Sequence, residues 1–335
     1  MDLNTIWFLL VGVLITGYAV LDGFDLGVGV LHLFTRDDAE RRAHLAAIGP
    51  VWDGNEVWLL TGGGALFAAF PPVYATVFSG FYLALVLVLV GLIARAVSLE
   101  FGHRVESARW RRAWDWAFGV GSLVPALLFG VAVGNVLRGV PIAADGAYTG
   151  TFLGLLNPYA LLLGVLGLAM FTMQGAVFLA VKTSGAEAER MRAWASGAWM
   201  AFVALFVAAA IATMFAAPHL FQGALTSPLR WALFLLLLGA VVAVPVALRA
   251  NAVFGAMIAS SAAILATIGL AAAGMFPRLV VSSTDAAYSL TIYNAASTPY
   301  TQTVMLVIAL IGMPIVIGYT IYIYRVFRGP AAAAY

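Results

Sequence analysis

The sequence predicts an all-α integral membrane protein with nine transmembrane helices. Of its 335 residues, 63% are hydrophobic and only 10% are charged, whereas an ordinary soluble domain has about 45–50% apolar and about 25% charged residues. The mean hydropathy is +1.00. Long apolar stretches recur along the chain without the alternating polarity of membrane β-barrel strands, so we expect the spans to be helices.

Nine segments are long and apolar enough to cross a bilayer, because a helix needs about 20 mostly apolar residues to span about 30 Å of hydrocarbon. The first starts in MDLNTIWFLL, which has neither the basic region nor the cleavage site of a signal peptide. Prolines in AFPPVY mark a tight turn between the second and third segments. We expect the nine helices at 7–33, 49–70, 73–97, 113–137, 155–181, 193–216, 229–249, 252–275 and 302–324.

The connections between these segments are polar, and none is long enough to form a soluble domain. We therefore expect one transmembrane domain over residues 1–335, built as two four-helix bundles plus one extra helix. Its first half, 1–150, holds the buried acidic residues, and its second half is 151–335. The longer connections are expected at 35–44, 98–112, 138–150, 182–192, 217–228 and 276–301.

Basic residues predict the orientation, because Lys and Arg in short loops are retained on the cytoplasmic side. Fourteen of them fall on one side of the membrane, and only Arg138, Arg230 and Arg278 fall on the other. We therefore expect the amino terminus outside and the carboxyl terminus inside. The net charge of +2 gives no reason to expect a nucleic-acid partner, and a chain without cysteine has no thiolate with which to bind a metal.

Carboxylates occur inside two of the expected spans. Asp22 and Asp25 lie three residues apart in the first span, and Asp53 and Glu56 repeat this spacing in the second. Residues three apart share one face of a helix. Because an acidic side chain at bilayer depth costs a few kcal/mol, such residues usually face the interior of a helix bundle and mark a functional site.

Further charged residues extend this series toward the inner surface. The third span ends with Arg95 and Glu100, and the fourth opens with Asp115. One interpretation is structural, with the acids in ion pairs or solvated at helix ends. The other is a proton entry path, since burial and a neighbouring carboxylate both raise a carboxyl pKa, and Arg95 then supplies a counter-charge. We favour the proton path for Asp53 and Glu56 and leave Asp115 open.

Other residue types give weaker signals. Trp52 and Trp58 flank the second pair of acids and Asn55 lies between those acids, so all three are candidates for supporting the pair. The histidines fall at span ends or in connections, so we expect no haem ligand in the membrane core and no metal site. They are His32, His44, His103 and His219.

Five motifs stand out in chain order: LDGFDLGVGVL, WDGNEVWLLTGGGALFAAFP, FSGFY, ARAVSLEF and NPYALLLGVL. Together they resemble subunit II of the cytochrome bd-type quinol oxidases. The resemblance implies a nine-helix subunit that ligates no haem and pairs with a larger subunit I, which carries haems b and d, oxidises quinol and reduces oxygen. It also implies small single-helix subunits, lipid contacts and a multi-pass location in a prokaryotic cell membrane, and it leaves a bound quinone open.

The same resemblance assigns roles motif by motif. Asp25 falls on the acid of the family's GFD motif, and Trp52 with Asp53 falls on its Trp-Asp pair. Arg95 and Glu100 fall on an arginine and an acid that line a cytoplasmic proton route. Some relatives carry Gln at the position of Glu56, and Asp22 is expected in a supporting role.

We therefore expect this chain to stabilise subunit I and to have no independent activity. It would conduct protons from the cytoplasm through Glu100, Arg95, Asp53 and Asp25 toward the oxygen-reducing haems, which contributes to a proton-motive force without a pump. The main alternative is a secondary transporter that uses the intramembrane carboxylates to couple proton movement to a solute. A third possibility is a membrane scaffold in which the acids only pair with other side chains.

Overall fold

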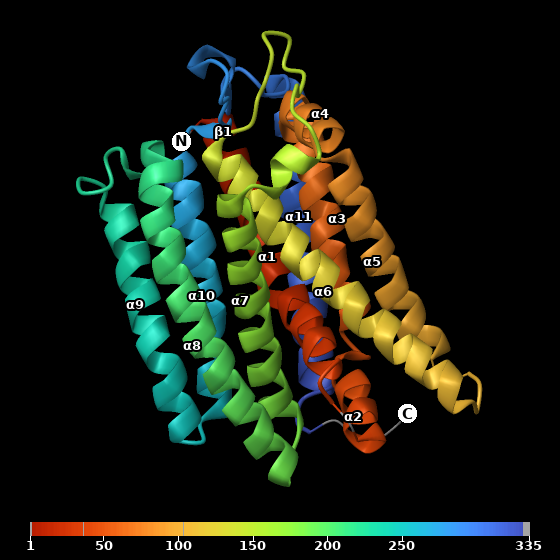
Figure 1. Ribbon diagram of the computed structural model, residues 1–335. Helices are drawn as coiled ribbons and strands as arrows, with labels where there is room; N and C mark the ends of the chain where they lie inside the picture. Colours follow the sequence, from red (N-terminus) through yellow and green to blue (C-terminus); the bar gives the residue numbers. More distant parts are fainter. Residues whose placement is uncertain (1, 36, 103, 331–335) are drawn as a thin grey trace.

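The computed structural model describes residues 2–35, 37–102 and 104–330. This part of the chain is mostly helical (Figure 1), and eight of its helices are long and apolar enough to cross a membrane. The expected all-helical membrane protein is thereby confirmed. The eight helices are α1 (Leu3–His32), α5 (Tyr82–Phe101), α6 (Ala108–Arg138), α7 (Pro158–Lys182), α8 (Gly185–Ala216), α9 (Pro228–Arg249), α10 (Val253–Met275) and α11 (Pro299–Val326).

The second expected span corresponds to α3 (Trp52–Ala69), which is not one of those eight. Its first two turns carry Asp53, Asn55 and Glu56, and these polar side chains lower its hydropathy. α3 nevertheless packs along α1 and touches α11. The described residues thus contain eight candidate spans where the sequence predicts nine.

The single helix expected at 73–97 is wrong. The structure has a short helix α4 (Pro71–Gly80) followed by α5, and the two meet at Phe81. α4 begins with two prolines, which suit the first turn of a helix. At its other end Tyr148 packs on Gly80, where a Cβ would lie 2.6 Å from Tyr148 Cγ. α4 therefore lies across one end of α3 and α5 (Figure 1).

Short elements connect the long helices. α2 (Asp38–Ile48) forms where a polar connection is expected, and the Asp37 side chain caps it by accepting a hydrogen bond from the Ala39 backbone N–H at 2.6 Å. The opposite end of the molecule carries an antiparallel strand pair within the connection between α10 and α11. The remaining elements are η1 (Leu153–Leu156), η2 (Pro218–Phe221), η3 (Ala286–Tyr288), β1 (Arg278–Val280) and β2 (Leu290–Thr291).

α7 lies at the centre of the molecule, packed against α1, α6, α8 and α10. Glycines let α1 and α7 approach closely: a Cβ on Gly175 would lie 2.5 Å from the carbonyl carbon of Gly27. Small residues of this kind commonly form the contacts between membrane helices. α8, α9 and α10 lie on one side of α7, and α3, α5 and α6 lie on the other (Figure 1).

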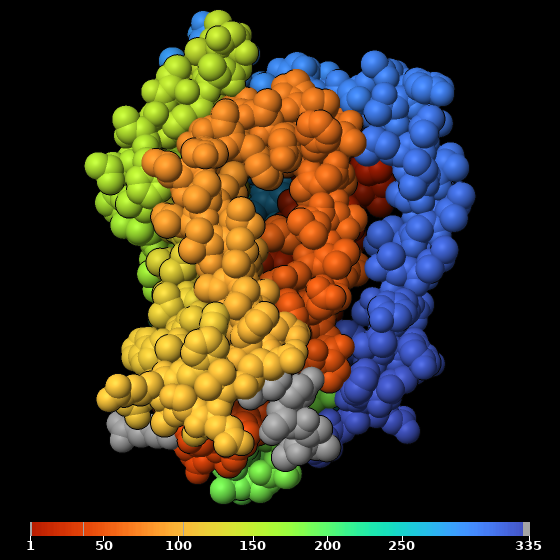
Figure 2. Space-filling model, turned by 90° about the vertical axis from the view of Figure 1, so that its right-hand side faces the viewer, coloured from red at the N-terminus to blue at the C-terminus, as the bar shows by residue number. Residues whose placement is uncertain are grey.

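One face of the molecule is formed by α3, α4, α5 and α11 (Figure 2). The surface is hollowed between α3 and α5, and residues of the amino-terminal helix are visible at the bottom of the hollow. α11 is the least covered helix, since the most apolar stretch within it buries none of its residues. This face leaves a large apolar area without protein cover.

Candidate functional site

Asp22 of α1 and Arg95 of α5 form an ion pair inside the helix bundle. The guanidinium donates two hydrogen bonds to the carboxylate, from Nη1 to Oδ2 at 3.0 Å and from Nη2 to Oδ1 at 2.5 Å. Neither side chain has any exposed surface. Two-point arginine–carboxylate pairs are among the strongest hydrogen-bonded contacts in proteins. A partner is needed here because a lone buried charge is costly.

Close packing between α5 and α6 holds the Arg95 backbone in place. A Cβ on Gly121 of α6 would lie 2.6 Å from the Gly91 carbonyl oxygen and 2.9 Å from the Arg95 nitrogen. Glycine at 91 and 121 therefore allows α6 to lie directly against this turn of α5. The Arg95 side chain leaves from there toward α1, where it meets Asp22.

Arg95 also contacts a carboxylate from a third helix. Glu56 of α3 places Oε1 3.5 Å from Arg95 Nη2. The Glu56 side chain is 23% exposed, whereas Asp22 and Arg95 are fully buried. One arginine thus joins carboxylates from α1 and α3, and the predicted counter-charge role of Arg95 has a geometric basis.

Asp25 lies one helical turn from Asp22 and is also fully buried. Asn55 donates from Nδ2 to Asp25 Oδ2 at 2.8 Å. Asn55 Oδ1 in turn accepts a hydrogen bond from the Tyr324 hydroxyl of α11 at 3.0 Å. Asp25 Oδ1 has no hydrogen-bond partner among the described residues, so one oxygen of this buried carboxyl group remains available for a further hydrogen bond.

The other predicted residues lie further out. Asp53 and Glu100 are exposed in the isolated chain, and Trp52 is half-buried. Trp58 packs on α1, because a Cβ on Gly17 would lie 2.4 Å from Trp58 Cε3. The structure therefore brings Asp22, Asp25, Asn55, Glu56 and Arg95 into one buried cluster and leaves Asp53 and Glu100 at the surface.

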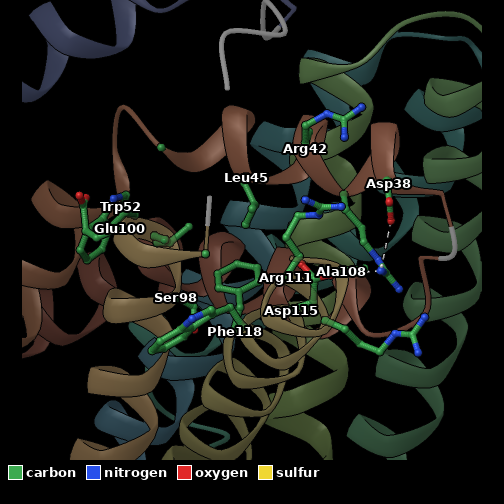
Figure 3. Close-up of a pocket in the computed structure, with 16 residues that line it drawn as sticks. Asp38, Arg42, Leu45, Trp52, Ser98, Glu100, Ala108, Arg111, Asp115 and Phe118 are labelled. Atoms are coloured by element: carbon green, nitrogen blue, oxygen red, sulfur yellow. Dashed lines mark hydrogen bonds and ion pairs between the residues drawn. The ribbon is translucent and has the colours of Figure 1, made fainter. Parts of the chain in front are cut away.

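A pocket of about 320 Å³ opens between α2, the end of α5 and the start of α6. Trp52 and Glu100 line it together with Ser98. Figure 3 shows Arg42 and Arg111 on one side of the pocket, away from Trp52 and Glu100. Glu100 therefore lies at an open, water-accessible cavity next to the turn of α5 that carries Arg95. Its lining includes four arginines, which are Arg41, Arg42, Arg111 and Arg112.

Two buried histidines form a separate polar cluster near this pocket. His32 contacts Asp115 with 3.0 Å between Nε2 and Oδ1, and its ring packs edge-on against Phe118. His44 Nε2 lies 3.5 Å from Glu187 Oε1. Asp115 is thus bonded within the protein, and is not simply solvated at a helix end.

Burial is the largest cause that lowers the pKa of His44, to about 3, with further contributions from His32 and Arg190. His44 is therefore neutral at physiological pH. No group of three metal-binding side chains occurs within residues 2–35, 37–102 and 104–330. His103, one of the four histidines considered above, lies outside the described residues.

Sequence comparison identifies the family. The model of cytochrome bd terminal oxidase subunit II matches residues 3–327. The chain belongs to this family. The resemblance inferred from the five motifs is thereby confirmed, and so are the multi-pass location in a bacterial cell membrane and the assignment to a cytochrome bd oxidase, which implies a subunit I as partner.

Curated relatives match over nearly the full length of this subunit II. Cytochrome bd-I ubiquinol oxidase subunit 2 of Escherichia coli K12 is 40% identical, covering 96% of this chain and 93% of the relative. Cytochrome bd ubiquinol oxidase subunit 2 of Bacillus subtilis is 38% identical, covering 98% and 96%. A chain of the solved bd oxidase from Geobacillus thermodenitrificans shares the fold, with a TM-score of 0.81, 17% identity and coverage of 98% and 99%.

Sequence reasoning missed one member of this subunit II cluster and one pairing between predicted members. Tyr324 lies in an apolar helix, about 270 residues from Asn55 in the chain, and no local pattern marks it. The pairing of Asp22 with Arg95 was also missed, although an arginine within an apolar span is a signal that a buried acid lies nearby. The sequence predicts only a supporting role for Asp22, yet the hydrogen bond that it accepts from Arg95 Nη2, at 2.5 Å, is the shortest in the cluster.

Proposed function

We propose that this chain is the haem-free subunit of a cytochrome bd-type quinol:oxygen oxidoreductase, where it stabilises subunit I and conducts protons from the cytoplasm to the oxygen-reducing haems. One observation carries the proposal: polar contacts join Glu56, Arg95 and Asp22 inside an apolar bundle, and the buried Asp25 lies one helical turn from Asp22. Buried ionisable groups in a membrane protein usually serve ion or proton movement. Uptake of these protons from inside contributes to a proton-motive force without a pump.

The haems are placed in subunit I because the buried histidines of this chain do not fit a haem. His32 is engaged by Asp115 and packed on Phe118. His44 faces Glu187. Neither histidine lines the pocket, so no redox step is assigned to this chain.

We place nine helices across the membrane by adding α3 to the eight apolar ones. The polar end of α3 is turned toward α1 and α5, where Asn55 and Glu56 find partners, so its low hydropathy does not prevent it from crossing. In this arrangement α1, α3, α5 and α6 form one four-helix bundle, α7 to α10 form the other, and α11 is the extra helix. The bias of basic residues places the amino terminus outside and the pocket at the cytoplasmic surface.

The proposed route starts at Glu100 in the pocket and continues to Asp53 and Glu56 on one face of α3. It ends at Asp25, whose Oδ1 has no partner among the described residues. Arg95 does not lose its proton in proteins. Its role in the route is therefore that of a fixed counter-charge. It attracts the neighbouring carboxylates and offsets part of their negative charge.

The face formed by α3, α4, α5 and α11 is the proposed contact surface for subunit I. This face has a large uncovered apolar area and a hollow between α3 and α5 (Figure 2). Asp53 of α3 is also exposed, so a protein partner fits this face better than lipid alone. A charged side chain facing acyl chains is unfavourable. A partner docked there would bring its haems next to α1 and the Asp25 end of the route.

The test is oxygen reduction by the purified complex carrying Asp25→Asn, Asp53→Asn or Glu56→Gln. Each variant should keep haem spectra and subunit content while turnover falls, most in Asp25→Asn and least in Glu56→Gln. We expect a loss of at least about tenfold for Asp25→Asn, which is about 1.4 kcal/mol of barrier. Asp145→Asn, in an exposed loop at the other end of the molecule, is the matched control and should leave turnover unchanged.

Full turnover in both Asp25→Asn and Asp53→Asn would exclude the route. Proton uptake by proteoliposomes adds a direct readout, because a blocked route slows uptake from the compartment that faces the pocket. Purification distinguishes an oxidase subunit from a transporter. An oxidase subunit should co-purify with a haem-bearing subunit, whereas a transporter would be a colourless chain that binds its solute alone.

A further inference from the structure

The pocket between α2, α5 and α6 lies where lipid headgroups meet the protein. α6 starts beside it with Trp110, Trp114 and Trp116, and tryptophans gather at the membrane–water boundary. Trp116 is 59% exposed and Phe101, the last residue of α5, is 53% exposed. These side chains surround the pocket with apolar surface that a membrane would cover. The pocket is therefore at the depth of the polar headgroups.

The pocket lining carries positive charge in excess, with four arginines against three acids, which are Asp38, Glu100 and Asp115. Arg41 is already engaged, with Nη1 3.1 Å from Asp115 Oδ2 and 3.5 Å from Asp38 Oδ1. By contrast, the side chains of Arg42, Arg111 and Arg112 form no hydrogen bond or ion pair with any described residue. Three guanidinium groups thus remain available around one cavity.

The remainder of the pocket is apolar and suited to the glycerol end of a lipid. Leu45, Leu99, Trp114 and Phe118 contribute to its lining, and Phe118 is buried. The volume of about 320 Å³ is at the lower end of the range of about 300–1,000 Å³ for small-molecule sites. That space accommodates a headgroup and leaves the acyl chains to run along the outside of α5 and α6.

We propose that this pocket binds the phosphodiester headgroup of an anionic membrane phospholipid, with the phosphate held by Arg42, Arg111 and Arg112. The planar guanidinium matches phosphate oxygens in a two-point geometry, and basic pockets between membrane helices favour anionic headgroups. A free phosphate shares this charge chemistry. The lipid is favoured because the tryptophan belt and the apolar lining contribute only when acyl chains are attached.

The experiment uses the complete oxidase complex, stripped of lipid in detergent and titrated with phosphatidylglycerol in native mass spectrometry. Parallel titrations use zwitterionic phosphatidylcholine and inorganic phosphate. Arg111→Gln/Arg112→Gln should weaken the tightest phosphatidylglycerol binding event of the complex by about tenfold or more, because charge-assisted hydrogen bonds to the phosphate are lost. The control pair is Arg109→Gln/Arg249→Gln, which removes the same charge from exposed positions at the same end of the molecule.

The proposal holds if binding is selective for phosphatidylglycerol over phosphatidylcholine, is lost in the pocket variant and is kept in the control pair. It is overturned if the pocket variant binds phosphatidylglycerol like the wild type, if phosphatidylcholine binds equally well, or if inorganic phosphate competes at equal concentration, which would assign the site to free phosphate. Should the double variant fail to assemble, Arg42→Gln replaces it, and unchanged selectivity in that single variant also overturns the proposal.

Discussion

Asp22 and Arg95 are held together by two hydrogen bonds, of 3.0 Å and 2.5 Å, and neither side chain has exposed surface. Glu56 lies on the other side of the same guanidinium, 3.5 Å away and partly exposed. The two carboxylates therefore depend on Arg95 to different degrees. Among the described residues Asp22 has no ion-pair partner other than Arg95, whereas Arg95 retains Glu56 if Asp22 is neutralised.

This asymmetry predicts unequal effects of removing either partner. Arg95→Gln leaves an uncompensated buried carboxylate and should destabilise the subunit by about 3–5 kcal/mol, which we expect to appear as lost assembly with subunit I. Asp22→Asn should cost less, because Glu56 still neutralises the arginine. Yield of intact complex and its melting temperature measure both effects.

The double variant Asp22→Asn/Arg95→Gln supplies the control for this prediction. It removes both charges, so it should be more stable than Arg95→Gln alone, as expected for a coupled buried pair. Equal stability of the double variant and Arg95→Gln would show that the two side chains do not act as a pair.

Tyr324 is expected to hold Asn55, and through it Asp25, in place. Tyr324→Phe removes the hydroxyl that donates to Asn55 Oδ1 at 3.0 Å and leaves that amide oxygen without its partner, at a cost of about 1–3 kcal/mol. Turnover should fall less than in Asp25→Asn, because the carboxyl group itself remains. Thermal unfolding and oxygen consumption of the complex check both parts.

Tyr322→Phe is the matched control, two residues away on α11. Tyr322 is 62% exposed and its hydroxyl donates to no described residue, so its loss should leave stability unchanged. If both tyrosine variants behave alike, the hydrogen bond to Asn55 has no measurable role.

The contact between α1 and α7 predicts a strong effect of one added methyl group. A Cβ on Gly27 would lie 1.9 Å from the Phe171 carbonyl oxygen, and because that oxygen belongs to the backbone of α7 the whole helix must move. Gly27→Ala should therefore destabilise the subunit by about 3 kcal/mol, at the upper end of the usual cost of overpacking. The melting temperature of the complex is the measurement.

Gly12→Ala tests whether the effect comes from contact rather than from the change in helix propensity. Nothing lies within 4 Å of a Cβ at Gly12, which is on the same helix. This variant should be neutral or slightly stabilising, by up to about 1 kcal/mol, since alanine is the better helix former. A comparable loss in the two variants would contradict the predicted close contact.

Much of the fold is predictable from apolar segments, because the thickness of the bilayer's hydrocarbon layer sets the same minimum length and apolar composition for every spanning helix. The exceptions have local causes. At the break around Phe81, Tyr148 packs against Gly80, a contact from a distant loop that no local pattern reveals. α2 forms where a polar connection is expected, because a capped helix of 11 residues satisfies its backbone without needing an apolar composition.

The candidate site is predictable in its residue types and less so in its pairing. Carboxylates three residues apart predict which faces of α1 and α3 turn inward. On α1 both Asp22 and Asp25 are buried, whereas on α3 only Glu56 turns toward Arg95 and Asp53 is exposed. Which arginine meets which acid depends on how far each helix is shifted along its neighbour. That shift is set by glycine contacts such as Gly91 with Gly121, and these are visible only in three dimensions.

His44 gives a pH-dependent prediction that is independent of catalysis. Its side chain is fully buried and its pKa is lowered to about 3, mainly by burial, whereas the unfolded chain has a histidine pKa of about 6.5. Between these values the unfolded state binds a proton that the folded state does not, so stability falls as the pH drops below about 6.5. At pH 5 this group alone should cost about 2 kcal/mol.

His44→Gln removes this titration and should flatten the dependence of melting temperature on pH between 7.5 and 5. The Glu187 carboxylate lies 3.5 Å from His44 Nε2. Because a pKa of about 3 lies below this pH range, Glu187→Gln should leave the His44 contribution to the decline unchanged. If acidification leaves the wild type unaffected, or if His44→Gln declines as steeply as the wild type, His44 is protonated and paired with Glu187 in the folded protein, and burial is not the dominant influence on it.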